Sequence, residues 1–194
     1  MKVALFGGTF DPPHMAHVLS VAWVLGACDL DAVWVLPVAR HALGKTPVDV
    51  NRRLDLCRLA FAPLVERVQV RDDDAVPDAT GYTLDLLSRL AMRHPHARFR
   101  LVVGSDVLGQ TDRWHRWDEV CRLAPPIVLP RPGWPVPLGY DGEVAPVLLP
   151  DLSSTRLRAD LAAGISLGSV ATPQRLRAPA PLPIRQTRAH HSPS

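Results

Sequence analysis

Two histidines follow a glycine pair near the start of the chain, and their spacing suits them to act together on a phosphate. The segment from Gly7 to His17 reads GGTFDPPHMAH, so His14 and His17 share one face of a helical turn. Gly7 and Gly8 let a backbone approach a ligand closely, and a helix start attracts anions. The pattern predicts a phosphate site with two imidazole donors. The simpler alternative is a tight turn with surface histidines. A zinc site is disfavoured because only Asp11 lies near as a third ligand.

A second candidate phosphate-binding segment lies near residue 155, where hydroxyl side chains precede an arginine. Residues 152–158 read LSSTRLR. Hydroxyls at a helix start accept hydrogen bonds from N–H groups that have no partner within the helix. An arginine one turn later is placed to pair with a phosphate. Taken alone, the segment is more simply an ordinary helix cap with a surface arginine.

Apolar runs alternate with amphipathic stretches along the chain, as in β-α-β units. Such units predict an α/β fold with a doubly wound parallel sheet, whose ligand crevice lies beyond the carboxyl ends of the strands. Asp49 stands where a helix N-cap is expected. The expected strands are residues 2–6, 33–36, 68–70, 99–103, 127–129 and 144–149. The expected helices are residues 15–25, 50–64, 83–93, 117–123 and 153–163.

Three segments fall outside this alternation. Residues 72–74 are a run of three aspartates and are most simply a solvated loop. Residues 125–150 contain eight prolines, which predicts an ordered but non-helical excursion. Residues 171–194 contain five prolines and four arginines with little apolar periodicity. We expect this tail to be disordered and the folded domain to span residues 1–170.

The length and charge of the chain restrict its function class. Its 194 residues fit one domain, and its net charge is +3. The tail holds four arginines and no acidic residue, so residues 1–160 carry a net charge of −1, which argues against a nucleic-acid-binding face. Three widely spaced cysteines indicate neither a disulfide framework nor a cysteine zinc site. No apolar run approaches the ~18 residues of a membrane span and no secretory signal is recognisable. A cytoplasmic location is therefore expected.

The segment from Gly7 to His17 resembles the opening of the HxGH nucleotidyltransferases, and more narrowly that of the nicotinate-nucleotide adenylyltransferase family. Residues 152–158 resemble the I-S-S-T-x-I-R signature of the same superfamily. The resemblance covers residues 1 to about 165 and implies a Rossmann-like nucleotidyltransferase fold. The chain departs from the family at Ala16, where a glycine usually precedes the second histidine. It departs again where a proline- and arginine-rich tail replaces the closing helix.

The resemblance implies adenylyl transfer from ATP to nicotinate mononucleotide, giving deamido-NAD and pyrophosphate. It implies Mg²⁺ bound through the ATP phosphates, with no metal site built from protein groups, and His14 and His17 as catalytic residues. Trp114 is expected to stack on the nicotinate ring, and Asp106 either to accept ribose hydroxyls or to cap a turn. The residues expected to bind ATP are Gly7, Gly8, Thr9, Phe10, His14, His17, Gly104, Asp106, Ser153, Ser154, Thr155 and Arg158. The residues expected to bind the mononucleotide are Lys45, Arg53, Tyr82, Thr83, Trp114 and His115.

Several alternatives remain open on the sequence alone. A related transferase would use nicotinamide mononucleotide or phosphopantetheine as the acceptor, and a homologue that has lost turnover would only bind nucleotides. A nucleic-acid binder acting through the basic tail would belong to a third class. Gly44, Lys45 and Thr46 do not form a P-loop, because Ala39 stands where its first glycine is required.

Overall fold

The computed structural model describes residues 1–39, 49–76 and 79–165. The predicted mononucleotide ligand Lys45 and the predicted tail, residues 171–194, lie outside these ranges. Among the described residues, no helix is both long enough and apolar enough to cross a membrane.

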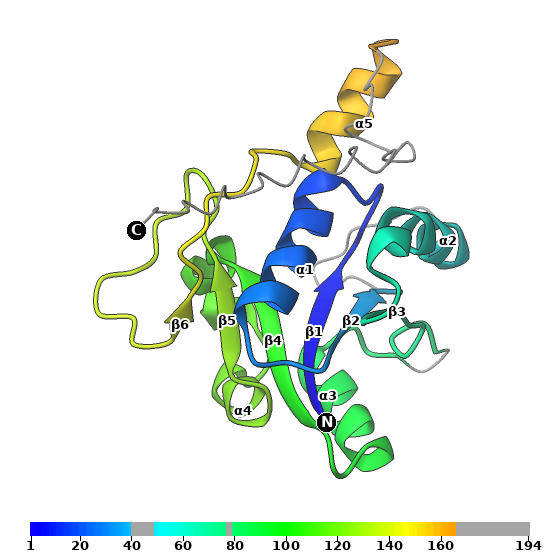
Figure 1. Cartoon of the computed structure of the whole chain (residues 1–194). Coiled ribbons are helices and arrows are strands. Elements are labelled where there is room, and N and C mark those ends of the chain that lie inside the picture. The colour runs from blue at the N-terminus through cyan, green and yellow to red at the C-terminus, as the bar shows by residue number, and fades with distance from the viewer. Residues whose placement is uncertain (40–48, 77–78, 166–194) are drawn as a thin grey trace, which may run out of the picture.

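A single parallel sheet of six strands forms the centre of the molecule (Figure 1). Its strand order is β3-β2-β1-β4-β5-β6, and every neighbouring pair is parallel. From β1 the chain adds β2 and β3 on one side and then β4, β5 and β6 on the other, which confirms the predicted doubly wound fold. The switch point of the sheet therefore lies between β1 and β4. The strands are β1 (Lys2–Gly8), β2 (Ala32–Pro37), β3 (Val68–Val70), β4 (Arg98–Gly104), β5 (Pro126–Leu129) and β6 (Glu143–Val144).

Helices cover both faces of the sheet, as the alternating pattern predicts. On β1, Ala4 and Phe6 pack into the cluster that includes side chains of α1 and α2, whereas Val3 and Leu5 face the cluster formed with α3 and α4. This alternation follows from the two-residue period of a strand. Burying each such side chain contributes roughly 1.5–3 kcal/mol. The helices are α1 (Met15–Ala27), α2 (Val50–Phe61), α3 (Thr83–Arg93), α4 (Trp117–Leu123) and α5 (Ser154–Ala162).

Two predicted elements are shorter than the sequence suggests. The helix expected over residues 50–64 begins as predicted, because the Asp49 carboxylate accepts the N–H groups of Asn51 and Arg52. It ends at Phe61 and continues as the 3-10 turn η1 (Ala62–Leu64), where Pro63 cannot donate to an α-helical ladder. The strand expected over residues 144–149 was wrong beyond Val144. Pro146 interrupts it, since proline cannot donate to a sheet ladder.

The prediction of a solvated loop at residues 72–74 was also wrong. Asp73 and Asp74 are buried, and only Asp72 is exposed. Asp73 forms a two-pronged ion pair with Arg71, with N–O distances of 2.6 and 3.2 Å, and a further ion pair with Arg93 at 3.3 Å. These carboxylates can be buried because arginine side chains from just after β3 and from α3 pair with them. The run of aspartates alone does not show which cations the fold brings to it.

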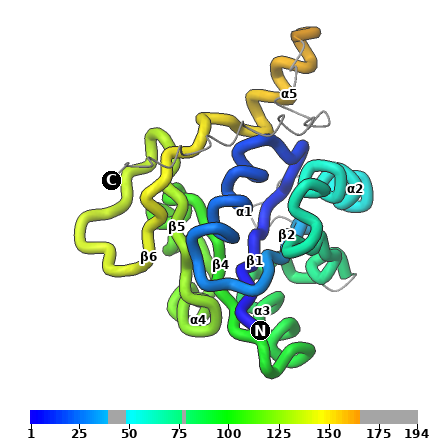
Figure 2. The backbone as a smooth tube through the Cα atoms, viewed as in Figure 1, coloured from blue at the N-terminus to red at the C-terminus, as the bar shows by residue number. Residues whose placement is uncertain are grey.

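The long segment between β5 and β6 is non-helical, as its prolines predict. Figure 2 shows it as a wide excursion beside the sheet. Its first turn returns close to β4, where Arg131 and Trp134 form an isolated antiparallel bridge. The excursion therefore supplies side chains to the carboxyl edge of the sheet.

Candidate active site

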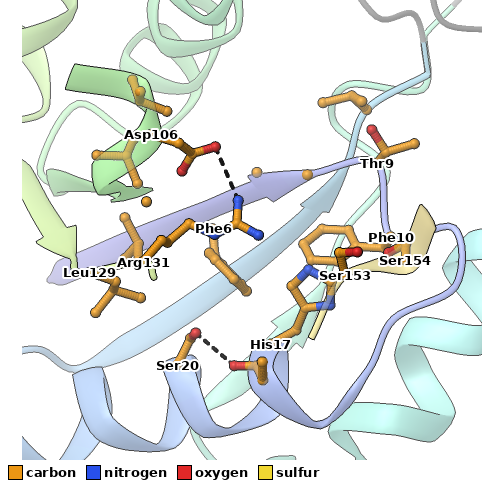
Figure 3. Close-up of a pocket in the computed structure, with 18 of the residues that line it drawn as sticks. Phe6, Thr9, Phe10, His17, Ser20, Asp106, Leu129, Arg131, Ser153 and Ser154 are labelled. Carbon is orange, nitrogen blue, oxygen red and sulfur yellow. Dashed lines mark hydrogen bonds and ion pairs between the residues drawn. The ribbon is translucent and has the colours of Figure 1, made fainter. Parts of the chain in front are cut away.

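One large cavity, about 1040 Å³, opens at the carboxyl ends of β1 and β4. This is the switch point of the sheet, where doubly wound folds bind ligands. Figure 3 shows that its wall combines Thr9, Phe10 and His17 from the start of the chain with Ser153 and Ser154 from the far end. Asp106 and Arg131 face them from the middle of the chain. Parallel strands thus bring distant segments to one edge.

The two predicted histidines lie at the first turn of α1. His14 is its N-cap residue, and its backbone N–H donates to Nδ1 of His17 at 3.1 Å. The two rings are stacked, with centroids 3.7 Å apart. Because Nδ1 of His17 accepts this hydrogen bond, a neutral His17 carries its proton on Nε2. That nitrogen is the donor which remains for a ligand.

Both imidazoles are held neutral by their surroundings. Burial, and then the positive charge of Arg131, lowers the pKa of His14 to about 4. Burial, followed by His14 and Arg131, lowers the pKa of His17 well below its usual value. Nδ1 of His14 is buried and has no hydrogen-bond partner among the described residues. The pair therefore offers neutral hydrogen-bonding groups to the cavity at neutral pH.

The loop after β1 is shaped by Phe10. Its backbone adopts a left-handed conformation with φ 49°, which costs roughly 1–2 kcal/mol for a residue with a side chain. Its ring is 2% exposed and meets the rings of Phe6 and His17 edge-on, at 5.5 and 4.9 Å between centroids. Burial of the Phe10 ring offsets the backbone strain, and its edge-on contact fixes the orientation of the His17 ring. Gly7, Gly8 and Thr9, also predicted ATP ligands, line the cavity beside it.

The start of α5 closes the cavity against the loop after β1. Ser153 caps the helix by accepting the N–H of Arg156 at 3.2 Å. Ser154 donates its hydroxyl to the carbonyl of Pro12 at 2.9 Å, across 142 residues of sequence. The guanidinium of Arg158 donates to the carbonyl oxygen of Asp11 and lies 3.4 Å from the hydroxyl of Thr155. The predicted hydroxyl segment is therefore fastened beside the histidine pair.

Gly104, the last residue of β4, and Asp106, which follows this strand, lie at the opposite wall. Asp106 forms an ion pair with Arg131 at 3.0 Å, and its other oxygen, Oδ1, is buried without a hydrogen-bond partner among the described residues. A Cβ on Gly104 would lie 2.3 Å from that oxygen and 2.6 Å from Cδ of Arg131, so the two side chains of the ion pair would have to shift to make room for it. Arg131 was absent from the residues predicted to bind either substrate. Its signal in the sequence is the segment RPG at residues 131–133, which resembles a segment that distinguishes the nicotinate-nucleotide adenylyltransferase family from its relatives.

A second group of predicted residues lines another part of the same cavity. Tyr82 and Thr83 lie at the start of α3, and Trp114 and His115 follow η2 (Ser105–Arg113). The rings of Tyr82 and His115 lie 4.9 Å apart, and Trp114 rests edge-on against Trp117 at 5.0 Å. The structure thus brings all four together around an aromatic-walled recess.

Arg53 takes a different position from the one the sequence predicts. It is 1% exposed, and its guanidinium donates to the carbonyls of Thr9 and Val38, at 2.7 and 2.8 Å. It is not among the described residues that line the cavity. The side chain ties the loop after β1 to the loop after β2, and its expected contact with the mononucleotide stays a prediction.

The site has no cluster suited to caging a metal ion. Among the described residues, no group of three or more histidine, cysteine, aspartate or glutamate side chains is arranged to hold one. The carboxylates of Asp11 and Asp106 line the cavity separately, one after β1 and one after β4. This donor set fits a hard cation that arrives with phosphate oxygens and water as its main ligands.

Comparison with known proteins identifies relatives over most of the chain. The cytidylyltransferase-like family model matches residues 5–160. A probable nicotinate-nucleotide adenylyltransferase of Anaeromyxobacter sp. (strain K) is 42% identical over 166 residues, which cover 84% of this chain and 85% of the relative. The nicotinate-nucleotide adenylyltransferase of Bacillus subtilis (strain 168) is 32% identical over 161 residues, covering 81% and 84%.

Solved structures share the fold at lower sequence identity. Plasmodium falciparum nicotinic acid mononucleotide adenylyltransferase complexed with APC superposes with a TM-score of 0.71 at 17% identity, covering 86% of each chain. The same enzyme complexed with NaAD gives a TM-score of 0.71 at 18% identity, covering 82% of this chain and 83% of the other. The Rossmann-like nucleotidyltransferase fold is thereby confirmed.

Proposed function

The chain belongs to the cytidylyltransferase-like proteins and, within them, to the nicotinate-nucleotide adenylyltransferase family, and we propose that it transfers the adenylyl group of ATP to nicotinate mononucleotide. The products are deamido-NAD and pyrophosphate. One observation carries the proposal. A single cavity runs from the His14–His17 pair and the start of α5 to the aromatic recess at Tyr82 and Trp114. Such a cavity accommodates two substrates side by side, as a direct transfer requires.

The reaction needs positioning more than it needs a protein nucleophile. A phosphate oxygen of the mononucleotide attacks the α-phosphorus of ATP in line, the bond from that phosphorus to the bridging oxygen breaks, and pyrophosphate leaves. No covalent intermediate on the protein is required. The barrier falls when both substrates are held in line and the growing negative charge meets preorganised donors.

The described residues divide these tasks by their place in the cavity. Nε2–H of His17 donates to the α-phosphate, because its Nδ1 is already occupied by the His14 N–H. His14, Arg158 and the start of α5 hold the β- and γ-phosphates, and Asp106 accepts the ribose hydroxyls. Mg²⁺ bound through the phosphates would supply charge neutralisation, and Asp11 and Asp106 are two of the carboxylates that line the same cavity.

The recess at Tyr82 and Trp114 binds the mononucleotide. Trp114 stacks on the pyridine ring, and the first N–H groups of α3, which begins at Thr83, face the carboxylate on that ring. A helix start favours an anion over a neutral amide, so the acid substrate is preferred over nicotinamide mononucleotide.

The acceptor is tested by turnover with Mg²⁺ and ATP and, in parallel, nicotinate mononucleotide, nicotinamide mononucleotide or phosphopantetheine. Pyrophosphate release is measured for each acceptor. The proposal predicts the highest kcat/KM with nicotinate mononucleotide. A higher kcat/KM with either other acceptor would reassign the substrate. ATP binding without pyrophosphate release from any acceptor would mark a nucleotide-binding homologue without turnover.

A further inference from the structure

Ser105 joins two strand ends of the site through one buried hydroxyl. It follows Gly104 at the end of β4 and is 1% exposed. Its Oγ accepts the backbone N–H of Arg131 at 2.9 Å and donates to the backbone carbonyl of Trp134 at 2.6 Å. Both partners belong to the turn that follows β5. One side chain therefore satisfies a donor and an acceptor of that turn from the neighbouring strand.

The turn that Ser105 fastens carries the cation of the ATP end of the cavity. From this turn the Arg131 side chain extends to Asp106 on the same wall of the cavity, as Figure 3 shows. It packs closely over Gly104, where an added Cβ would lie 2.6 Å from Cδ of Arg131 and would force this side chain to move. Arg131 also acts on the opposite wall, since its charge lowers the pKa of both His14 and His17. The place of this guanidinium thus affects both walls of the proposed ATP site.

Arg131 is held by its ion pair with Asp106, by the Ser105 hydroxyl and by the bridge to Trp134. The ion pair with Asp106 restrains only the tip of a side chain that is 46% exposed, and an ion pair of this exposure is worth little by itself. The backbone of the turn is restrained by the Ser105 hydroxyl and by the bridge between Arg131 and Trp134. Without the hydroxyl, the N–H of Arg131 and the carbonyl of Trp134 lose a buried partner.

We propose that Ser105 is a positioning residue that fixes the Arg131–Trp134 turn, so that Arg131 stands over Asp106 at the ATP end of the site and engages the nucleotide there. Ser105 itself touches neither substrate and is not among the residues that line the cavity. The inference rests on the proposed adenylyl transfer for the identity of the nucleotide. The fixing of Arg131 against the histidine pair does not depend on that identity.

The test compares Ser105→Ala with Ser20→Ala. Ser20 is also buried and lines the cavity, but among the described residues its hydroxyl bonds within its own helix, to the carbonyl of Ala16 at 2.7 Å. In steady-state turnover, Ser105→Ala is predicted to raise the KM for ATP on the order of tenfold, since it removes two hydrogen bonds, with a much smaller change in kcat. Ser20→Ala is predicted to leave the KM for ATP unchanged. Equal KM changes in both variants would overturn the inference.

A double-mutant cycle asks whether Ser105 acts through Arg131. Arg131→Gln is predicted to raise the KM for ATP by itself, and Ser105→Ala added to it is predicted to have almost no further effect. If the double variant raised the KM for ATP by the product of the two single effects, Ser105 would act by another route, and the proposal would be refuted. If Ser105→Ala did not fold, Ser105→Cys, which keeps a weak donor of similar size, is predicted to give a smaller rise in the KM for ATP that also vanishes in Arg131→Gln.

A titration of the substrate-free protein separates this inference from the proposed function. Within the part of the chain that the structure describes, seven aspartates and arginines line the cavity together with the histidines: Asp11, Asp74, Asp106, Arg113, Arg131, Asp151 and Arg158. When Ser105→Ala releases Arg131, NMR titration is predicted to show higher pKa values for His14 and His17 than in the parent. Unchanged histidine pKa values would refute the positioning role even in an active enzyme. Raised values without any adenylyl transfer would refute the function and leave the positioning role standing.

Discussion

Replacing His17 by alanine removes the donor that the structure aims at the proposed α-phosphate. Nδ1 of His17 accepts the backbone N–H of His14, so Nε2–H is the one ring donor that remains for a ligand. Its lowered pKa keeps the ring neutral at neutral pH, and the hydrogen bond therefore strengthens as charge develops on the phosphate. His17→Ala abolishes this interaction in the transition state.

The size of the effect follows from the kind of donor that is lost. Removing one preorganised donor from a developing oxyanion costs on the order of 10²–10³ in kcat, or ~3–4 kcal/mol. Ground-state ATP affinity should change far less, because the loop after β1 and the start of α5 remain. The variant also loses the acceptor for the His14 N–H, which costs roughly 1 kcal/mol of folding stability.

The assay follows pyrophosphate release at saturating ATP and nicotinate mononucleotide, with ATP affinity measured separately by calorimetry. His96→Ala is the matched control, because His96 is exposed and precedes β4, at the edge of the sheet away from the cavity. The control should match the parent in both measurements. A His17→Ala protein that is folded and turns over within a few-fold of the parent would refute the role given to Nε2.

Three further predictions follow from contacts around the cavity. Trp114→Ala should weaken mononucleotide binding by roughly 1–3 kcal/mol and leave the KM for ATP nearly unchanged in steady-state kinetics. Arg53→Met should cost about 3 kcal/mol in urea unfolding, since two partly buried carbonyls lose their donor. Unchanged stability with loss of mononucleotide binding would instead restore Arg53 as a phosphate ligand. The folded state binds fewer protons at His14 than the unfolded chain between pH 6.5 and about 4. Stability in urea should therefore fall as the pH drops through that range, and less so in His14→Gln.

The sheet and its helices could be predicted from the sequence because their signals are local. The apolar runs before Gly7 and Gly104 and the Asp49 cap depend on neighbours within a few residues. Asp73 could not be placed, because its burial depends on Arg93, which is 20 residues away on α3. A run of charges in the sequence gives no sign of cations that the fold will bring to it.

The candidate site divides in the same way. His14 and His17 form a local motif, and their joint position at the cavity follows from one helical turn. Arg53 and Arg131 differ, since the function of each guanidinium depends on which distant backbone or carboxylate it meets. Arg53 meets Thr9 and Val38, whereas Arg131 meets Asp106 across 25 residues. These pairings are determined only by the tertiary fold.

The central claim is transfer of the adenylyl group to the phosphate of the mononucleotide, and the origin of the atoms in the products tests it. The parent protein is incubated with Mg²⁺, ATP and nicotinate mononucleotide whose phosphate oxygens carry ¹⁸O, and the products are identified by mass spectrometry. We predict one deamido-NAD for each pyrophosphate, with all of the label in the dinucleotide and none in the pyrophosphate. Label in the pyrophosphate, or AMP formed without dinucleotide, would contradict the account.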